Sequence, residues 1–180
     1  MPGFGDPRAH LLVVGLAPAA HGGNRTGRVF TGDASGDFLF AALHRAGYAS
    51  QATSVARGDG LVLTGAYVAA AARCAPPGNK PTPEEFGRCL PFLVREIEAL
   101  PNLKVVLALG AHGWRAAIEA LVANGAPRPK PLPRFAHGAE TRLGATALLG
   151  SYHVSQQNTF TGRLTAAMLD AVLERTRGIS

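Results

Sequence analysis

Residues 11–15, LLVVG, form a short apolar run that ends at a glycine and leads into a polar, Gly-rich loop, AAHGGNRTGRVFTGD, at residues 19–33. A continuous apolar run of this length is typical of a buried strand. Three further segments have the same character, and amphipathic stretches lie between them. The expected strands lie within residues 11–15, 61–73, 104–109 and 147–152, and the expected helices within residues 35–47, 83–100, 114–123 and 161–177. This alternation predicts an α/β fold: a three-layer α/β/α sandwich with a central, mainly parallel four-stranded sheet.

Cap and turn residues mark some boundaries of these elements. Pro81-Thr82-Pro83-Glu84-Glu85 combines a Thr N-cap, a proline at the first helical position and acidic residues in the first turn, which together predict a helix start. The segment PRPKPLPRFAHGAETR, residues 127–142, predicts a Pro-rich basic loop before the last strand.

Composition indicates one domain over residues 1–180. The chain has 180 residues, of which 47% are hydrophobic and 17% charged, enough for one sizeable core and too apolar for a disordered chain. No apolar run approaches the roughly 18 residues that a membrane helix needs. The first ten residues, MPGFGDPRAH, hold no apolar signal segment. We therefore expect a cytoplasmic protein without a membrane span.

The charge balance favours an anionic partner. Lys plus Arg is 18 against 12 Asp plus Glu, a net charge of +6, and 15 of the 18 basic residues are Arg. Arginine pairs with phosphates in a bidentate manner and stacks on bases, so this surplus suits nucleic acid. A compositional bias expressed on a solvated surface is the alternative, and charge alone does not decide between them.

Four loops follow the expected strands and are expected to meet at the carboxyl edge of the sheet, where sites of such folds gather. They are residues 15–33, 73–80, 110–114 and 152–162. Gly22 and Gly27 have P-loop spacing, but Arg28 and Val29 follow where that motif needs Lys and Ser or Thr, which disfavours a nucleotide triphosphatase. A G-x-S-x-G hydrolase motif and zinc-ligand spacing are also absent.

Three motifs in these loops carry a family resemblance. GLAPAAHGGNRTGRVFTGDASGDFL (residues 15–39), RCAPPGNKPTPEE (73–85) and SYHVSQQNTFTGRLT (151–165) resemble, in this order, the uracil-DNA glycosylase superfamily, and most closely its family 5, the type b enzymes of bacteria and archaea. The resemblance implies hydrolysis of the N-glycosidic bond of uracil, and often of hypoxanthine, in DNA, which leaves an abasic site. The expected partner is therefore DNA that contains deaminated bases.

The resemblance also assigns roles around the extruded base. Phe30 would stack on the base, Asn79 would read its edge, and the loop at Gly15 and Ala17 would contact it through the backbone. His153 would donate to the oxyanion that develops on the base, an effect of several kcal/mol when the donor is preorganised. A core phenylalanine, a turn asparagine and a structural histidine are the ordinary alternatives for these residue types.

Asp33 is the expected second catalytic residue. The best-known members of the superfamily carry a polar catalytic residue shortly after the opening glycine of the first loop, where this chain has only alanine and proline. Family 5 shares that apolar loop, and the Asp of its FTGD segment is implicated instead. A carboxylate there orients water and stabilises a cationic sugar. The alternative is an N-cap role ahead of the next helix; we favour catalysis.

The remaining assignments concern DNA contacts and a cofactor. Arg25, Arg28, Gln156, Asn158 and Arg163 are the expected DNA-binding residues, with the segment after His153 entering the duplex. Related enzymes hold a [4Fe-4S] cluster with four cysteines, of which two correspond to Cys74 and Cys89. The other two lie in a segment ahead of the PGFGDP sequence, so this chain supplies two of four ligands. Either the start lies upstream, or the cluster has been lost.

The leading hypothesis is a monomeric DNA-repair glycosylase that needs no other cofactor. A catalytically silent nucleic-acid-binding module and a nucleoside hydrolase on the same sheet are the alternatives. The combination of Phe30, Asp33, Asn79 and His153 argues against the first alternative, and the Arg-rich loops argue against the second.

Overall fold

The fold is built on a six-stranded sheet with the strand order β1-β3-β2-β4-β6-β5. The computed structural model describes residues 1–179, and of Asn79 only the backbone. The strands are β1 (Phe4–Gly5), β2 (Leu11–Gly15), β3 (Ala66–Ala70), β4 (Val105–Leu109), β5 (Glu140–Leu143) and β6 (Thr146–Ser151). The four central strands, β3, β2, β4 and β6, are parallel to one another and match the four expected strands. The predicted α/β class and mainly parallel sheet are therefore confirmed.

The two edge strands, β1 and β5, correct the prediction of four strands. Both pair antiparallel with their neighbours, with Phe4 opposite Val68 and Glu140 opposite Leu149. Neither contains an apolar run, because an edge strand packs only partly against the core; β1 has two residues, and β5 lies at the end of the predicted Pro-rich loop. Strand pairing rather than local hydrophobicity therefore defines them.

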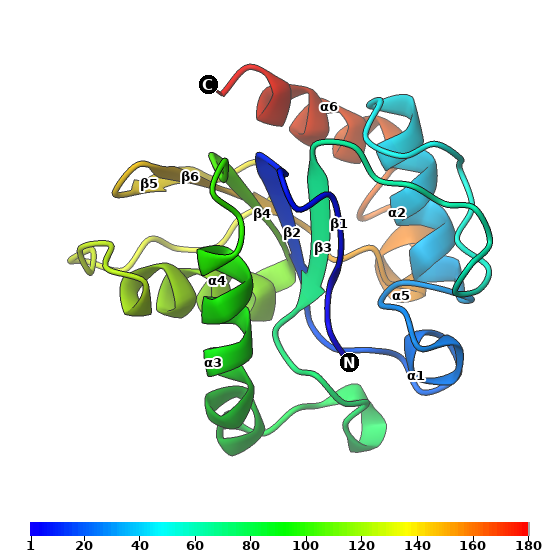
Figure 1. The fold of residues 1–180 in the computed structure, drawn as a ribbon, viewed down its shortest axis with the longest axis horizontal. Coiled ribbons are helices and arrows are strands. Elements are labelled where there is room, and N and C mark those ends of the chain that lie inside the picture. The colour runs from blue at the N-terminus through cyan, green and yellow to red at the C-terminus, as the bar shows by residue number, and fades with distance from the viewer. Residues whose placement is uncertain (180) are drawn as a thin grey trace.

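Helices cover both faces of the sheet, as predicted for a three-layer sandwich (Figure 1). The helical elements are α1 (Gly23–Thr26), α2 (Ala34–Arg45), η1 (Pro77–Asn79), α3 (Pro83–Glu98), α4 (Gly110–Ala123), α5 (Gln156–Phe160) and α6 (Ala166–Arg177). Successive residues of β2 alternate between the two layers: Leu11 and Val13 pack in the core under α2 and α6, and Leu12 and Val14 in the core under α3 and α4. Each strand is thus buried on both faces, which explains its continuous apolar sequence.

The helix boundaries follow local cap chemistry. Thr82 and Glu85 form a reciprocal capping box at the start of α3, which confirms the predicted helix start. The helix predicted at residues 161–177 starts later, because α6 begins at Ala166, and the short α5 lies in the preceding segment that was predicted as a loop. Gly162 adopts a left-handed φ of 73° between α5 and α6, and the Thr165 side chain caps α6.

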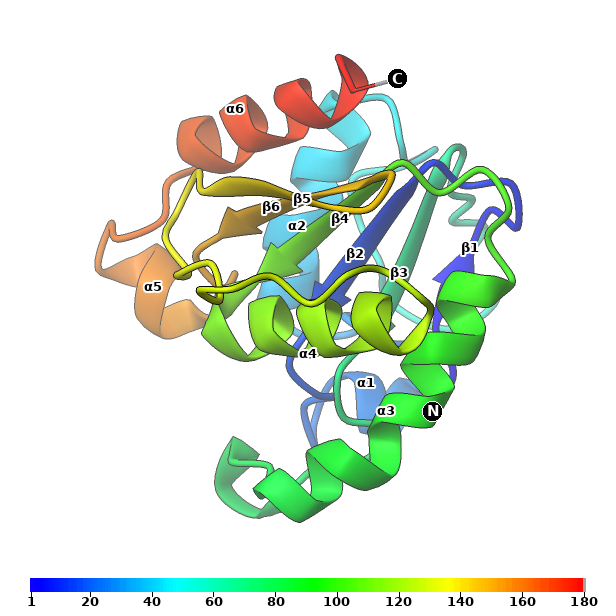
Figure 2. The same ribbon diagram turned by 90° about the vertical axis from the view of Figure 1, so that its left-hand side faces the viewer.

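The carboxyl ends of the parallel strands share one edge of the sheet. Figure 2 shows the arrowheads of β2, β4 and β6 pointing toward the edge at which α1 and α5 lie. The loops after β2, β3 and β6 therefore meet there, as the sequence predicts, whereas the loop predicted at residues 110–114 is the first turn of α4, which begins directly after β4. Among the described residues, no helix combines the length and apolar character needed to cross a membrane.

Candidate active site

Phe30 lies at the centre of the carboxyl edge and contacts the end of β2. Its ring packs so closely on Gly15 that a Cβ built there would lie 2.4 Å from Cζ of Phe30. The Phe30 ring centroid is 6.1 Å from that of His153, at an interplanar angle of 36°. Phe30 is 8% exposed and joins the core beneath α2, so its ring both closes the core and faces the imidazole. The structure therefore brings three predicted site residues together.

The backbone of Phe30 is held in an unusual conformation. Its φ is 51°, the left-handed region that a bulky side chain rarely adopts and that often marks functional sites. The carbonyl of Phe30 faces Gly36, where a Cβ would lie 2.0 Å from the oxygen. Buried hydrogen bonds from the neighbouring residues 28 and 31 fix the turn from both sides. The surrounding structure thus compensates the backbone strain at this position.

Arg28 has an internal role in the structure. The residue is 8% exposed, and its guanidinium donates to Thr31 Oγ1 at 3.0 Å, to Ser54 Oγ at 2.8 Å and to Asp59 Oδ2 at 2.7 Å. Arg28 holds the pKa of the Asp59 carboxyl well below its usual range. A DNA phosphate would have to displace this buried ion pair. We therefore correct the sequence assignment and leave Arg28 out of the DNA-contacting set.

His153 follows β6 and packs against the start of α4. A Cβ built at Gly110 would lie 3.2 Å from Cβ of His153, so the glycine makes room for the imidazole. Burial lowers the pKa of His153 to about 4; the negative charge of Asp33 acts in the opposite direction, and His112 lowers it further. At neutral pH the ring is thus uncharged and carries one N–H, which suits a hydrogen-bond donor to a developing oxyanion.

Asp33 combines the two roles that the sequence left open. Its Oδ1 accepts a hydrogen bond of 2.9 Å from the amide of Gly36 and caps α2. Its Oδ2 lies against Gly22, where a Cβ would be only 1.8 Å away. The carboxylate is also close enough to His153 to act on its pKa. The N-cap role is therefore real, and it fixes the carboxylate at the start of α2, where its charge raises the pKa of His153 against the effect of burial.

Two predicted base contacts are less completely defined. Ala17, in the loop after β2, is half-buried. Asn79 ends the 3-10 turn η1, and its side chain lies outside the described part of the structure, so its predicted contact with the base edge stays a prediction.

Apart from the internal Arg28, the predicted DNA contacts are three exposed residues and one half-buried residue. Arg25, Gln156 and Arg163 are exposed, and the Arg163 guanidinium lies 4.6 Å above the centroid of the Tyr152 ring. Asn158 is half-buried, and its side-chain amide donates to the carbonyl of His153 at 2.8 Å. Asn158 therefore has a partner within the protein, next to the imidazole.

The exposed Phe160 adds an apolar group to this edge. Phe160 ends α5 and is 78% exposed, more than any other large hydrophobic side chain in the described residues. It lies in the segment after His153 that the sequence predicts to enter the duplex, and that role stays a prediction.

Cys74 and Cys89 line one surface cavity of about 600 Å³ beside the start of the chain. Both thiols are free, and Cys89 Sγ accepts a hydrogen bond of 3.4 Å from the amide of Arg73. A cubane cluster takes four thiolates. Within the described residues, no group of three or more His, Cys, Asp or Glu side chains lies close enough to hold a metal ion. The cavity therefore offers half a ligand set, which does not fit a cluster by itself.

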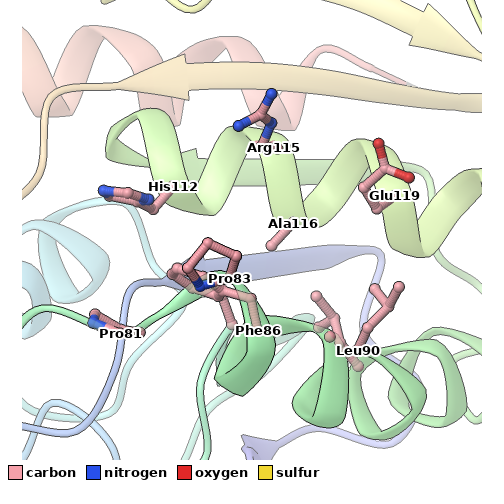
Figure 3. Close-up of a pocket in the computed structure, with 11 residues that line it drawn as sticks. Pro81, Pro83, Phe86, Leu90, His112, Arg115, Ala116 and Glu119 are labelled. Atoms are coloured by element: carbon pink, nitrogen blue, oxygen red, sulfur yellow. The ribbon is translucent and has the colours of Figure 1, made fainter. Parts of the chain in front are cut away.

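A second hollow, of about 410 Å³, lies between α3 and α4, where the Phe86 ring stacks on His112 with centroids 5.4 Å apart (Figure 3). Its lining in the described structure includes no residue that the sequence assigned to the site. His112 links this hollow to the site, because the His112 imidazole also lowers the pKa of His153. The sequence placed His112 in a converging loop but gave no reason to single it out.

Comparison with known proteins identifies the family to which the chain belongs. Residues 2–177 match the family model of the uracil DNA glycosylase superfamily. A type-5 uracil-DNA glycosylase of Mycobacterium tuberculosis is 50% identical over 182 residues, which cover 100% of this chain and 66% of the relative. The type-5 enzyme of Thermus thermophilus is 54% identical over 98% of this chain and 79% of its own length. The type-5 enzyme of Pyrobaculum aerophilum is 45% identical over 97% of this chain and 74% of its own length.

These matches define the class of protein. A type-4 uracil-DNA glycosylase of Pyrobaculum aerophilum is only 34% identical, over 66% of this chain. The chain therefore belongs to the uracil-DNA glycosylase superfamily, and within it to the type-5 family. It spans somewhat less than two thirds of the Mycobacterium relative.

Proposed function

We propose that this chain is a monofunctional uracil-DNA glycosylase that hydrolyses the N-glycosidic bond of uracil in DNA and leaves an abasic site. The observation that carries the proposal is the meeting of a carboxylate and an uncharged imidazole beside one aromatic ring. Phe30 and Asp33 come from the loop after β2 and His153 from the segment after β6, and the contacts above hold each of them in place. The type-5 names of the relatives support the same reaction.

The geometry suits the charges that develop in this reaction. The target base leaves the stack, at a cost of a few kcal/mol, and enters the pocket against the Phe30 ring. Bond breaking gives a sugar with oxocarbenium character and an anionic base. The N–H of neutral His153 stabilises the anionic carbonyl oxygen, and the Asp33 carboxylate stabilises the cationic sugar and orients the water that attacks it.

The DNA-facing part of the proposal uses the exposed residues of the same edge. Arg25 and Arg163 contact phosphates, and Gln156 and Phe160 enter the gap that the flipped base leaves. We further propose that the protein acts as a monomer in the cytoplasm and that hypoxanthine is also a substrate. No step in this mechanism requires the iron–sulfur cluster known from relatives; iron and sulfide analysis measures whether one is bound.

The test is base release from defined oligonucleotides. Duplexes with a single uracil, a single hypoxanthine or undamaged bases are incubated with the protein, and abasic sites are then cleaved with alkali. Strand cleavage only at the damaged position supports the proposal. Binding without cleavage supports the silent binding module instead, and turnover of free nucleosides supports the nucleoside hydrolase.

Asp33→Asn separates catalysis from helix capping. Asparagine caps a helix about as well as aspartate, so the fold is expected to stay intact. Loss of the carboxylate charge is expected to slow base release by about 10²- to 10⁴-fold. Asp37→Asn, in the first turn of the same helix, is the matched control and should retain its activity. Near-normal turnover of Asp33→Asn would refute the catalytic assignment.

A further inference from the structure

The strand end that carries His153 is bordered by the last part of the Pro-rich loop. Residues 136–139 pair with β6, since the amide of Gly138 donates to Gly150 O at 2.8 Å and the amide of Gly150 donates to Ala139 O at 2.9 Å. The absence of a side chain at Gly150 permits this approach, because a Cβ there would lie 2.6 Å from the carbonyl oxygen of Ala136. His137 is thereby held next to the end of β6.

His137 contacts the residue immediately before His153 in two ways. Its Nδ1 accepts a hydrogen bond of 3.2 Å from the backbone amide of Tyr152. Its ring stacks on the Tyr152 ring, with centroids 5.0 Å apart and an interplanar angle of 27°. The hydrogen bond requires an Nδ1 without a proton. Burial and the nearby charge of Arg175 lower the pKa of His137, which favours the neutral imidazole.

Asn158 holds the same dipeptide from its other end. Its side-chain amide donates to the carbonyl of His153 at 2.8 Å, whereas His137 accepts from the N–H of Tyr152. The backbone that orients His153 is therefore fixed at one donor and one acceptor, and Gly110 limits the movement of the imidazole itself. We propose that His137 is a positioning residue for base excision, which keeps His153 in register with Asp33 through the Tyr152 amide.

This inference rests on the proposed function, and two substitutions test it. Phenylalanine at position 137 keeps a ring to stack on Tyr152 but has no acceptor. Asparagine places an acceptor close to the position of Nδ1 but removes the ring. We expect His137→Phe to lower kcat for uracil release about tenfold with KM within about twofold, because a misplacement of about 1 Å costs that much or more. His137→Asn is expected to stay within about threefold of the unsubstituted chain.

Controls separate positioning from general damage. His44 also bonds a backbone group, Ala49 O at 2.9 Å, but lies at the opposite end of α2, so His44→Phe should leave kcat unchanged. If thermal unfolding shows that His137→Phe does not fold, His137→Gln replaces it; its amide lies too far along the side chain to accept from Tyr152, and the same loss is expected. Unchanged kcat in the variants without the acceptor, or an equal loss in His137→Asn, overturns the proposal.

A second measurement does not depend on activity. The imidazole signals of His153, followed by NMR, should shift in His137→Phe and stay in place in His137→Asn and His44→Phe. Unmoved signals in His137→Phe overturn the positioning role. If the unsubstituted chain releases no uracil, the proposed function fails, while this measurement still decides whether His137 positions His153.

Discussion

Acidification should destabilise this protein, and His153 should make a large contribution to this loss. Burial lowers the pKa of this imidazole to about 4 in the folded chain, against an ordinary value of 6.5. Between these two values the unfolded chain binds a proton that the folded chain does not. The contribution of His153 is therefore constant above about pH 6.5, is lost progressively as the pH falls toward 4, and is fully lost below that.

The magnitude follows from the difference of about 2.5 pH units. At 1.36 kcal/mol per unit, complete loss amounts to about 3 kcal/mol. The part that falls between pH 7 and pH 5 is about 2 kcal/mol. This is a large fraction of the 5–15 kcal/mol that is typical of a folded domain, so it is measurable by urea unfolding.

The assay compares the unsubstituted chain with His153→Asn at pH 7 and pH 5. His137, whose pKa is also lowered, contributes to the pH dependence of both chains, so only the difference between them reports His153. We expect the unsubstituted chain to lose about 2 kcal/mol more than the variant. The same pH dependence in both chains, or an NMR titration of His153 near 6.5, would refute the burial argument and with it the uncharged donor.

Further predictions concern the supports of the site. Arg28→Met removes the charged partner of Asp59, a half-buried carboxylate that keeps its backbone N–H donors, and should lower the free energy of unfolding by about 1–3 kcal/mol, measured by urea denaturation. Gly15→Ala places a methyl group 2.4 Å from the Phe30 ring and should lower kcat/KM for uracil release by about tenfold or more. Gly87→Ala is the control, because its Cβ meets open space, and it should leave kcat/KM unchanged. Arg163→Gln should reduce the slope of log K against log salt for duplex DNA by about one; an unchanged slope contradicts the phosphate contact.

The central sheet was predictable because its signals are local. Each parallel strand is buried on both faces and therefore reads as a continuous apolar run, and the cap at Thr82 fixes the start of α3. The edge strand β1 was missed because its partner, β3, is distant in sequence, and β5 because its sequence, ETRL, lacks an apolar run although its partner β6 follows directly. The start of α6 was placed too early because the cap at Thr165 was not recognised, and the short α5 lies in residues that were predicted as a loop.

The site was predictable to the extent that it follows the motifs. Phe30, Asp33 and His153 meet as the order of their loops implies. The internal role of Arg28 was not predictable, because its ion pair with Asp59 joins positions 31 residues apart, and no local sequence pattern relates them. His137 lies in a segment that reads only as a Pro-rich basic loop, so its contact with Tyr152 appears only once β6 is in place.

The Gly-rich character of the first loop has its explanation in the packing of the site. Gly22 and Gly27 have the spacing of a phosphate-binding loop, yet each has a separate requirement: the Asp33 carboxylate occupies the space of a Cβ at Gly22, and Gly27 ends α1 with a left-handed φ of 74°. The absence of a side chain likewise leaves space for the Phe30 ring at Gly15 and for His153 at Gly110. Because each functional side chain rests against a position without a Cβ, the glycines bring the acid, the ring and the imidazole closer together than ordinary residues allow. A sequence rich in flexible residues thus produces a closely packed site.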